Sequence, residues 1–348
     1  MATEEVRFHS RGATLAATLK LPDGASGDAP VAAVTHGPGW LGLRDAKLYH
    51  PYHEAILAAG IAVLVFDYRG FGDSGGSATY LDPMSQVDDW RAAISYLETR
   101  PEIDSGRIGA FGSGGTGGGN AVMVAGLDDR IRVAVSQVPI ADGRDWLHRM
   151  RREHEWLEFL GRIEADRRAR AATGEAELVA PRDGIMVPTP ERKTTTIKSD
   201  VDQRVPAQVE LASAEAIFAY RPIDVVGKIA PRALMLIAVE GDATTPEDHA
   251  FALYERAGGP KRLVVQTGTT HYAAYEQYRD VVNPLIVEWF QRHLTSGEVL
   301  VREAGAESDV IRLSRPAATP ASGSGRASDA AEARVPAAQP SAPTEAGR

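Results

Sequence analysis

The chain contains no cysteine among its 348 residues. Disulfide scaffolds, thiolate metal sites and cysteine nucleophiles are therefore excluded, and any covalent catalysis has to use another side chain. No run of five or more consecutive Lys or Arg is present, and the formal net charge is -9. This charge disfavours nucleic acid and anionic membranes as partners and leaves small neutral or uncharged polar molecules open as substrates.

Long apolar runs are also missing. No apolar run approaches the roughly 20 residues that a membrane-spanning helix needs. The first residues, MATEE, carry neither the basic region nor the apolar core of a secretory signal. We therefore expect a cytoplasmic protein without a membrane span.

From residue 31 onward, short β-branched or apolar runs alternate with longer helical stretches. Strands are predicted near 31–35, 62–67, 107–111, 132–137, 233–239 and 262–266. Helices are predicted near 46–59, 85–100, 117–127, 247–257 and 277–293. An antiparallel strand pair around Gly12 precedes them. Continuous Val, Ile and Leu runs between helices indicate an α/β fold whose mostly parallel sheet is covered on both faces.

Two regions do not follow this alternation. Residues 140–222 combine a charged helical stretch with a Pro-rich and Thr-rich segment, and an insertion of this length is typical of a lid. Residues 316–348 are dominated by Ala, Pro, Ser and Gly without an aromatic residue, so disorder is expected from about 316. The predicted division is a core over 1–139, a helical cap over 140–222, a second core part over 223–298 and a C-terminal tail over 299–348.

Residues 67–75, which read DYRGFGDSG after a predicted strand, resemble the post-strand loop of the α/β-hydrolase superfamily. The resemblance covers about residues 25–295 and favours the branch with acyl-peptidase-like, ester-cleaving and C–C bond hydrolases. Upstream, THGPGW at 35–40 is similar to that superfamily's oxyanion loop, which implies backbone donors near Gly37, Gly39 and Trp40. A tight strand-to-helix turn is the structural alternative for this loop.

Two further segments resemble those that carry the acid and the base of the catalytic triad. Asp242 follows a predicted strand in VEGDATTP, and His271 follows the last core strand in GTTHY. The resemblance implies that His271 is the general base and that Asp242 orients its imidazole. The chain order of acid and then base is that of the fold. A structural alternative for Asp242 is a favourable carboxylate at a helix N-terminus.

The position of the nucleophile is atypical, because residues 112–119 read GSGGTGGG. Counting from the strand places Gly114 where the resemblance implies a Ser, Cys or Asp, and counting back from the helix places Gly115 there. Three interpretations stay open. A shifted turn would present Ser113, or Thr116 would act between small residues, or no covalent nucleophile exists and the glycine loop binds an anion or polar group.

These features predict a hydrolase that acts on a small ester, amide or β-diketone-like C–C substrate. Its predicted site comprises Ser113 or Thr116, Asp242, His271 and backbone groups at Gly37, Gly39, Trp40, Gly114 and Gly115. A lyase, cyclase or water-direct hydrolase without a covalent nucleophile stays open, as does a non-catalytic binding protein. No metal-ligand spacing or nucleotide loop is found, so neither a metal nor a cofactor is expected. Cap helices and edge strands are compatible with a homodimer.

Overall fold

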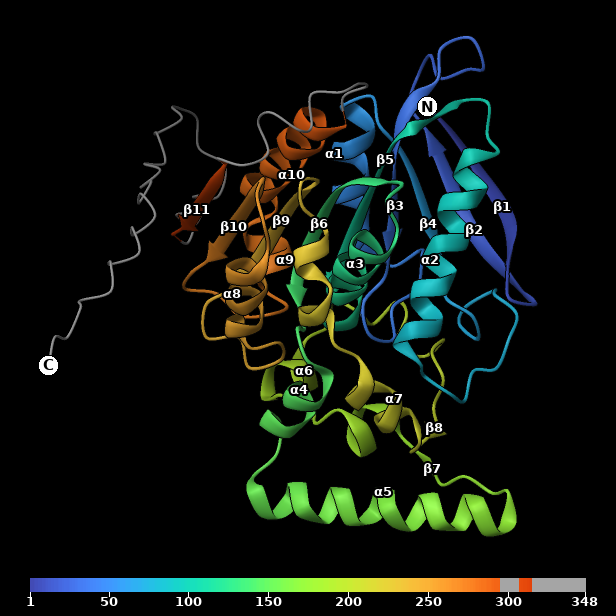
Figure 1. Cartoon of the computed structure of the whole chain (residues 1–348), viewed down its shortest axis with the longest axis vertical. Helices are drawn as coiled ribbons and strands as arrows, with labels where there is room; N and C mark the ends of the chain where they lie inside the picture. Colours follow the sequence, from blue (N-terminus) through green and yellow to red (C-terminus); the bar gives the residue numbers. More distant parts are fainter. Residues whose placement is uncertain (295–306, 315–348) are drawn as a thin grey trace, which may run out of the picture.

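The computed structural model describes residues 1–294 and 307–314. Within them a nine-stranded sheet forms the centre of the molecule, in the order β1-β2-β4-β3-β5-β6-β9-β10-β11 (Figure 1). Its strands are β1 Ala2–Ser10, β2 Ala13–Leu21, β3 Val31–Gly37, β4 Ala62–Phe66, β5 Ile103–Gly114, β6 Ile131–Pro139, β9 Ala233–Val239, β10 Lys261–Gln266 and β11 Ser308–Leu313.

The predicted α/β fold is confirmed. The first two strands form the expected antiparallel pair, β2 also runs antiparallel to β4, and every later neighbour in the sheet is parallel. All residues of β4 and β9 are buried, which explains why these strands read as unbroken apolar runs.

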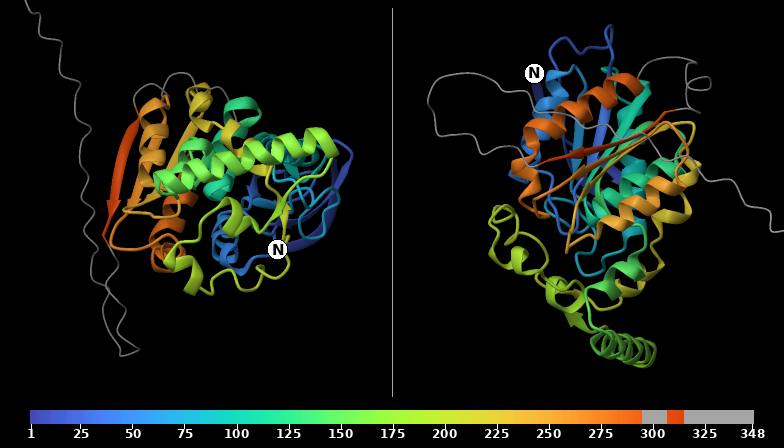
Figure 2. Two further views of the ribbon diagram at one scale, coloured as in Figure 1. Left: turned by 90° about the horizontal axis from the view of Figure 1, so that it is seen from below. Right: turned by 90° about the vertical axis from the view of Figure 1, so that its left-hand side faces the viewer.

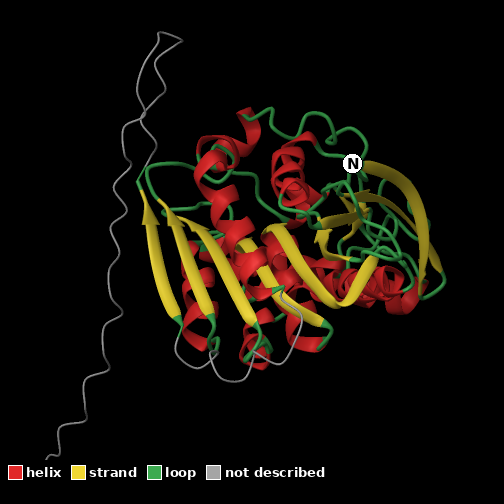
Figure 3. Cartoon of the chain, turned by 90° about the horizontal axis from the view of Figure 1, so that it is seen from above, coloured by secondary structure: helices red, strands yellow, loops and turns green. Residues whose placement is uncertain are grey.

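Helices cover both faces of the sheet (Figure 3). Alternate residues of each strand face opposite sides, so that Leu234 and Leu236 of β9 join one core cluster while Met235 and Ile237 join the other. One face is covered by α2 Pro83–Glu98, α3 Gly115–Leu127 and α8 Glu247–Arg256. The other is covered by α1 His50–Ala58, α9 Ala274–Gln277 and α10 Arg279–His293.

The helix boundaries have local causes. Pro83 occupies the first turn of α2, and the side chain of Asp82 accepts hydrogen bonds from the amides of Met84 and Ser85. The predicted helix near 46–59 is shorter than expected, because a 3-10 turn over Lys47–Tyr49 precedes α1.

Residues 140–222 connect β6 to β9 and lie below the sheet in Figure 1, at the end to which the β6 arrow points. They contain α4 Gly143–Arg149, α5 Glu153–Thr173, α6 Pro190–Thr194, α7 Ser213–Ala219 and the short strands β7 Leu178–Val179 and β8 Val209–Glu210. The view from below shows α5 crossing this end of the molecule (Figure 2). The segment therefore lies at the edge of the sheet where the parallel strands end and the loops that follow them begin.

One strand lies in the segment that we predicted as the C-terminal tail. β11 pairs in parallel with β10, and Ile311 and Leu313 are buried against the core. A segment of six residues has too little sequence pattern to be recognised as a strand when its pairing with β10 is not known. The disorder predicted from about residue 316 lies outside the described residues. Over the part of the chain that the structure describes, no helix is long and apolar enough to cross a membrane.

Candidate active site

Four loops meet at the carboxyl end of the parallel strands. They follow β3, β5, β9 and β10, and they bring together Gly39, Gly114, Asp242 and His271. Ligands of α/β sheets bind at this edge, because the loops that leave neighbouring parallel strands converge there. The sequence separates these residues by up to about 230 positions, and the topology of the sheet brings them to one place.

Asp242 and His271 form a buried pair. Nδ1 of His271 lies 2.7 Å from Oδ2 of Asp242. The other oxygen of Asp242 accepts the amides of Thr244 and Thr245 at 2.7 and 3.0 Å, and the Thr245 hydroxyl donates to Oδ2 at 3.0 Å. Burial alone would raise the pKa of Asp242, but the imidazole and these donors hold it below its usual value. The carboxylate is thus ionised. It holds the imidazole at Nδ1, so that Nε2 is available for proton transfer.

We call the turn between β5 and α3 the elbow, and glycine occupies both of its positions at which the resemblance implies a nucleophile. Gly114 ends the strand with φ 76°, Gly115 begins the helix with φ 27°, and both line the cavity beside His271. A Cβ on Gly112 would lie 2.0 Å from the carbonyl oxygen of Gly117. Only glycine therefore allows the strand and the helix to approach this closely.

Ser113 and Thr116 do not line the cavity. The Ser113 side chain is completely buried, and its hydroxyl lies 2.8 Å from the hydroxyl of Tyr275 and 3.4 Å from Oε1 of Gln137. Thr116 is also buried, and its hydroxyl has no hydrogen-bond partner among the described residues. The structure thus brings Gly114 and Gly115 to the Asp242–His271 pair and leaves both candidate hydroxyls behind the cavity wall.

The loop after β3 contacts the elbow directly. A Cβ on Gly39 would lie 2.6 Å from the carbonyl oxygen of Ser113, so the backbones touch and glycine is required. The amide of Gly39 donates to the hydroxyl of Tyr49 at 3.2 Å, whereas the amide of Trp40 makes no hydrogen bond to any described residue. Gly37 packs against the indole of Trp90 and does not line the cavity.

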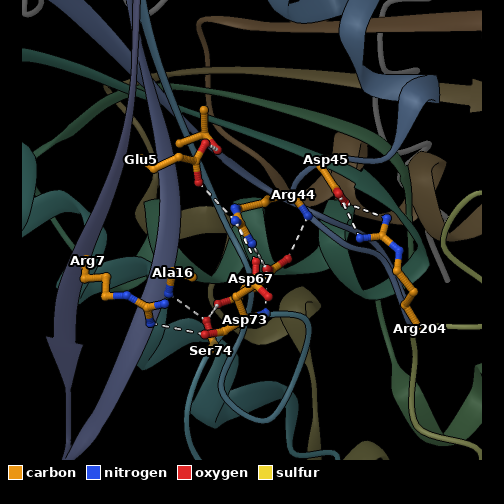
Figure 4. A network of polar contacts seen from close by, with 10 residues as sticks. Glu5, Arg7, Ala16, Arg44, Asp45, Asp67, Asp73, Ser74 and Arg204 are labelled. Atoms are coloured by element: carbon orange, nitrogen blue, oxygen red, sulfur yellow. Dashed lines mark hydrogen bonds and ion pairs between the residues drawn. The ribbon is translucent and has the colours of Figure 1, made fainter.

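Residues 67–75, the loop that resembles the post-strand loop of the α/β-hydrolase superfamily, support the chain next to the site (Figure 4). Asp67 is buried, pairs with the guanidinium of Arg44 and accepts its backbone amide at 2.8 Å. Arg44 also pairs with Asp73 at 2.9 Å. Further along, Asp45 pairs with Arg204 at 2.8 Å. These contacts hold the chain beyond Trp40 between the sheet and the segment over 140–222.

The cavity is closed by side chains from the segment over 140–222. Trp146, Arg182, Met186, Ile197 and Lys198 line it together with the core loops. The cavity volume is about 40 Å³, taken as the space that the centre of a water-sized sphere can occupy.

Only some aromatic residues of the segment over 140–222 reach the cavity. Trp146 lines it, whereas Trp156 and Phe159 pack against Phe218. Arg182 and Lys198 were missed, because nothing in their local sequence distinguishes them from solvated basic residues.

Comparisons with known proteins agree with the fold. The model of the X-Pro dipeptidyl-peptidase (S15) family matches residues 11–273. An uncharacterized 31.7 kDa protein of Escherichia coli is 28% identical over 83% of this chain and all of its own length. A thiohydrolase of Aspergillus aculeatus is 24% identical over 63% of this chain and 72% of its own. The α/β hydrolase GrgF of a Penicillium species superimposes with a TM-score of 0.71 at 20% identity, covering 84% of this chain and 99% of its own.

Proposed function

The chain belongs to the X-Pro dipeptidyl-peptidase (S15) family and is an α/β-fold hydrolase, and from this premise we propose that it cleaves small esters or thioesters with a water molecule as the nucleophile. One observation carries the proposal. The Asp242–His271 pair faces a cavity in which both candidate nucleophile positions are glycine, and among the described residues no serine lines that cavity. The thiohydrolase relative supports a thioester as one substrate class.

In the proposed mechanism His271 acts as the general base. Because Asp242 binds Nδ1, Nε2 is free to take a proton from water. The oxygen of that water forms a bond to the carbonyl carbon, and the carbonyl electrons move to its oxygen. When the tetrahedral intermediate collapses, the bond to the alkoxide or thiolate breaks, and the imidazolium of His271 returns its proton to this leaving group.

The oxyanion of this intermediate would be bound by backbone amides. Trp40 supplies an amide with no hydrogen bond to a described residue, and the first amides of α3 are not capped by a side chain. The amide of Gly39 would contribute after exchanging its bond to Tyr49. Amides at a helix N-terminus favour negative charge, which makes this loop pair suited to an oxyanion. Residues 140–222 would act as the cap that limits access of bulk water.

Steady-state and rapid kinetics test the proposal on a panel of p-nitrophenyl esters and N-acetylcysteamine thioesters. We expect His271→Ala to lower kcat/KM by about 10²–10⁴-fold, in the range of general base catalysis. Ser113→Ala and Thr116→Ala should each stay within a few-fold of the natural protein, and no burst of p-nitrophenol should precede the steady state. A burst together with an acyl adduct on Ser113 or Thr116, seen by mass spectrometry, would refute the water mechanism.

A further inference from the structure

The ionisable groups that line the cavity include two cations and no carboxylate. Arg182 and Lys198 come from the segment over 140–222, and no Asp or Glu of the described residues lines the cavity with them. The whole chain has a net charge of -9, so this local charge runs against the overall charge. Charges of one sign inside a low-dielectric cleft attract a ligand of the opposite sign.

Lys198 is the more deeply placed of the two. Its side chain is almost completely buried, and its Nζ donates to the carbonyl oxygens of Trp40 at 3.1 Å and Leu41 at 3.4 Å. An ammonium has three donors, so one N–H is left for a ligand. Burial, with Arg182 and Arg192 nearby, lowers the pKa of Lys198 to about 7. An anion beside the ammonium would favour its charged form.

The neighbouring arginines share a single carboxylate. Oδ1 of Asp202 accepts from Arg182 at 3.0 Å and from Arg192 at 2.7 Å. Nε of each arginine is buried without a partner among the described residues. Asp200, the other carboxylate that acts on Lys198, accepts a backbone amide instead. Buried charges in proteins are normally paired, and this cluster therefore has the capacity to bind one more anionic group.

We infer that the substrate carries a carboxylate, which Lys198 and Arg182 hold while the scissile carbonyl lies beside His271. The inference rests on the proposed hydrolytic function and specifies its substrate class. Because Lys198 binds the carbonyl groups of Trp40 and Leu41, its ammonium lies next to the loop proposed to hold the oxyanion. The substrate class is therefore an ester or thioester that also carries an ionised carboxyl group, in contrast to the neutral molecules that the net charge leaves open, and the monothioester of a dicarboxylic acid is its simplest member.

Binding can be measured without turnover in the full-length His271→Ala protein. The probes are the dicarboxylates from succinate to adipate and the corresponding neutral diamides, titrated by calorimetry at constant ionic strength. We expect at least one dicarboxylate to bind tenfold or more tightly than its diamide. Lys198→Gln and Arg182→Gln, each made in the His271→Ala background, should each reduce this preference by tenfold or more. The matched control is Lys193→Gln, which removes one positive charge from an exposed side chain of the same segment and should leave the preference unchanged.

The outcomes separate this inference from the proposed function. Equal binding of every acid and its diamide, or a preference that survives Lys198→Gln and Arg182→Gln, would overturn the carboxylate site. Arg182→Lys keeps the positive charge and should restore part of the preference for the dicarboxylate that Arg182→Gln loses. This recovery would show that the loss in Arg182→Gln comes from the missing charge and not from misfolding. If a dicarboxylate binds as expected but its N-acetylcysteamine monothioester is not cleaved by the natural protein, the hydrolytic proposal fails and the carboxylate site stands.

Discussion

If water is the nucleophile, as we propose, replacing Gly114 with serine should introduce a covalent nucleophile. Gly114 ends β5 at the elbow, and a Cβ built there lies 3.4 Å from Cα of Gly39 and 3.6 Å from the hydroxyl oxygen of Tyr275. Both are ordinary van der Waals distances, so the side chain fits without displacing its neighbours. The new hydroxyl would point into the cavity that His271 also lines.

The cost of this change is conformational. Gly114 has φ 76° and ψ 122°, a conformation that residues with a Cβ rarely adopt and that costs them roughly 1–3 kcal/mol. Removing a glycine from the unfolded chain returns about 0.4–1 kcal/mol. The net loss is about 1 kcal/mol, which corresponds to a fall in Tm of about 2–4 °C. Gly114→Ala carries the same backbone strain without a hydroxyl and is the matched control.

Reaction with a fluorophosphonate, read by intact and peptide mass spectrometry, measures the result. Gly114→Ser should be labelled at position 114, whereas the natural protein and Gly114→Ala should not be labelled. Adding His271→Ala to Gly114→Ser should abolish the labelling, because the serine loses its base. If the folded Gly114→Ser protein stays unlabelled while Gly115→Ser is labelled, the assignment of the elbow position to Gly114 is wrong.

Three further changes test the supports of the site. Asp242→Asn should lower kcat by about 10³-fold or more, because an amide does not hold the tautomer of His271 that leaves Nε2 free; a loss below tenfold in stopped-flow assays contradicts this role. Asp67→Ala should reduce the free energy of unfolding in urea by about 1.5–3 kcal/mol, since it removes the buried charge-assisted hydrogen bonds to Arg44 while Asp73 stays as its partner, and a change below about 1 kcal/mol would count against it. Burial lowers the pKa of His36 to about 3, so below pH 6.5 the unfolded chain takes up a proton that the folded chain does not. The contribution of His36 to the free energy of unfolding is present above pH 6.5 and is lost as the pH falls toward 3, with about 2 kcal/mol lost by pH 5. His36→Asn should flatten this slope in urea titrations at pH 7 and pH 5, and an unchanged slope refutes the assignment.

The sequence predicted the core of the fold because the signals there are local. Strands such as Ala233–Val239 are buried on both faces and read as continuous apolar runs, and α2 begins at a capping Asp82 followed by proline. Strand β11 was not predicted because its six residues have too little strand pattern of their own. The strand forms through its pairing with β10. The positions of Asp242 and His271 after their strands were also readable, since strand ends and the following turns have local signatures.

The sequence by itself therefore determined the α/β class, the absence of cysteine chemistry and the glycines at the turn where a nucleophile is expected. Only the tertiary structure decided that Ser113 faces Tyr275 and Gln137 and that Gly114 faces the cavity, because one step along the backbone at the end of a strand reverses the side on which a side chain lies. The structure also decided that Lys198 and Arg182 stand over the site. Their place depends on how a segment of irregular loops and short helices folds back over the strand ends, and no local periodicity encodes that contact.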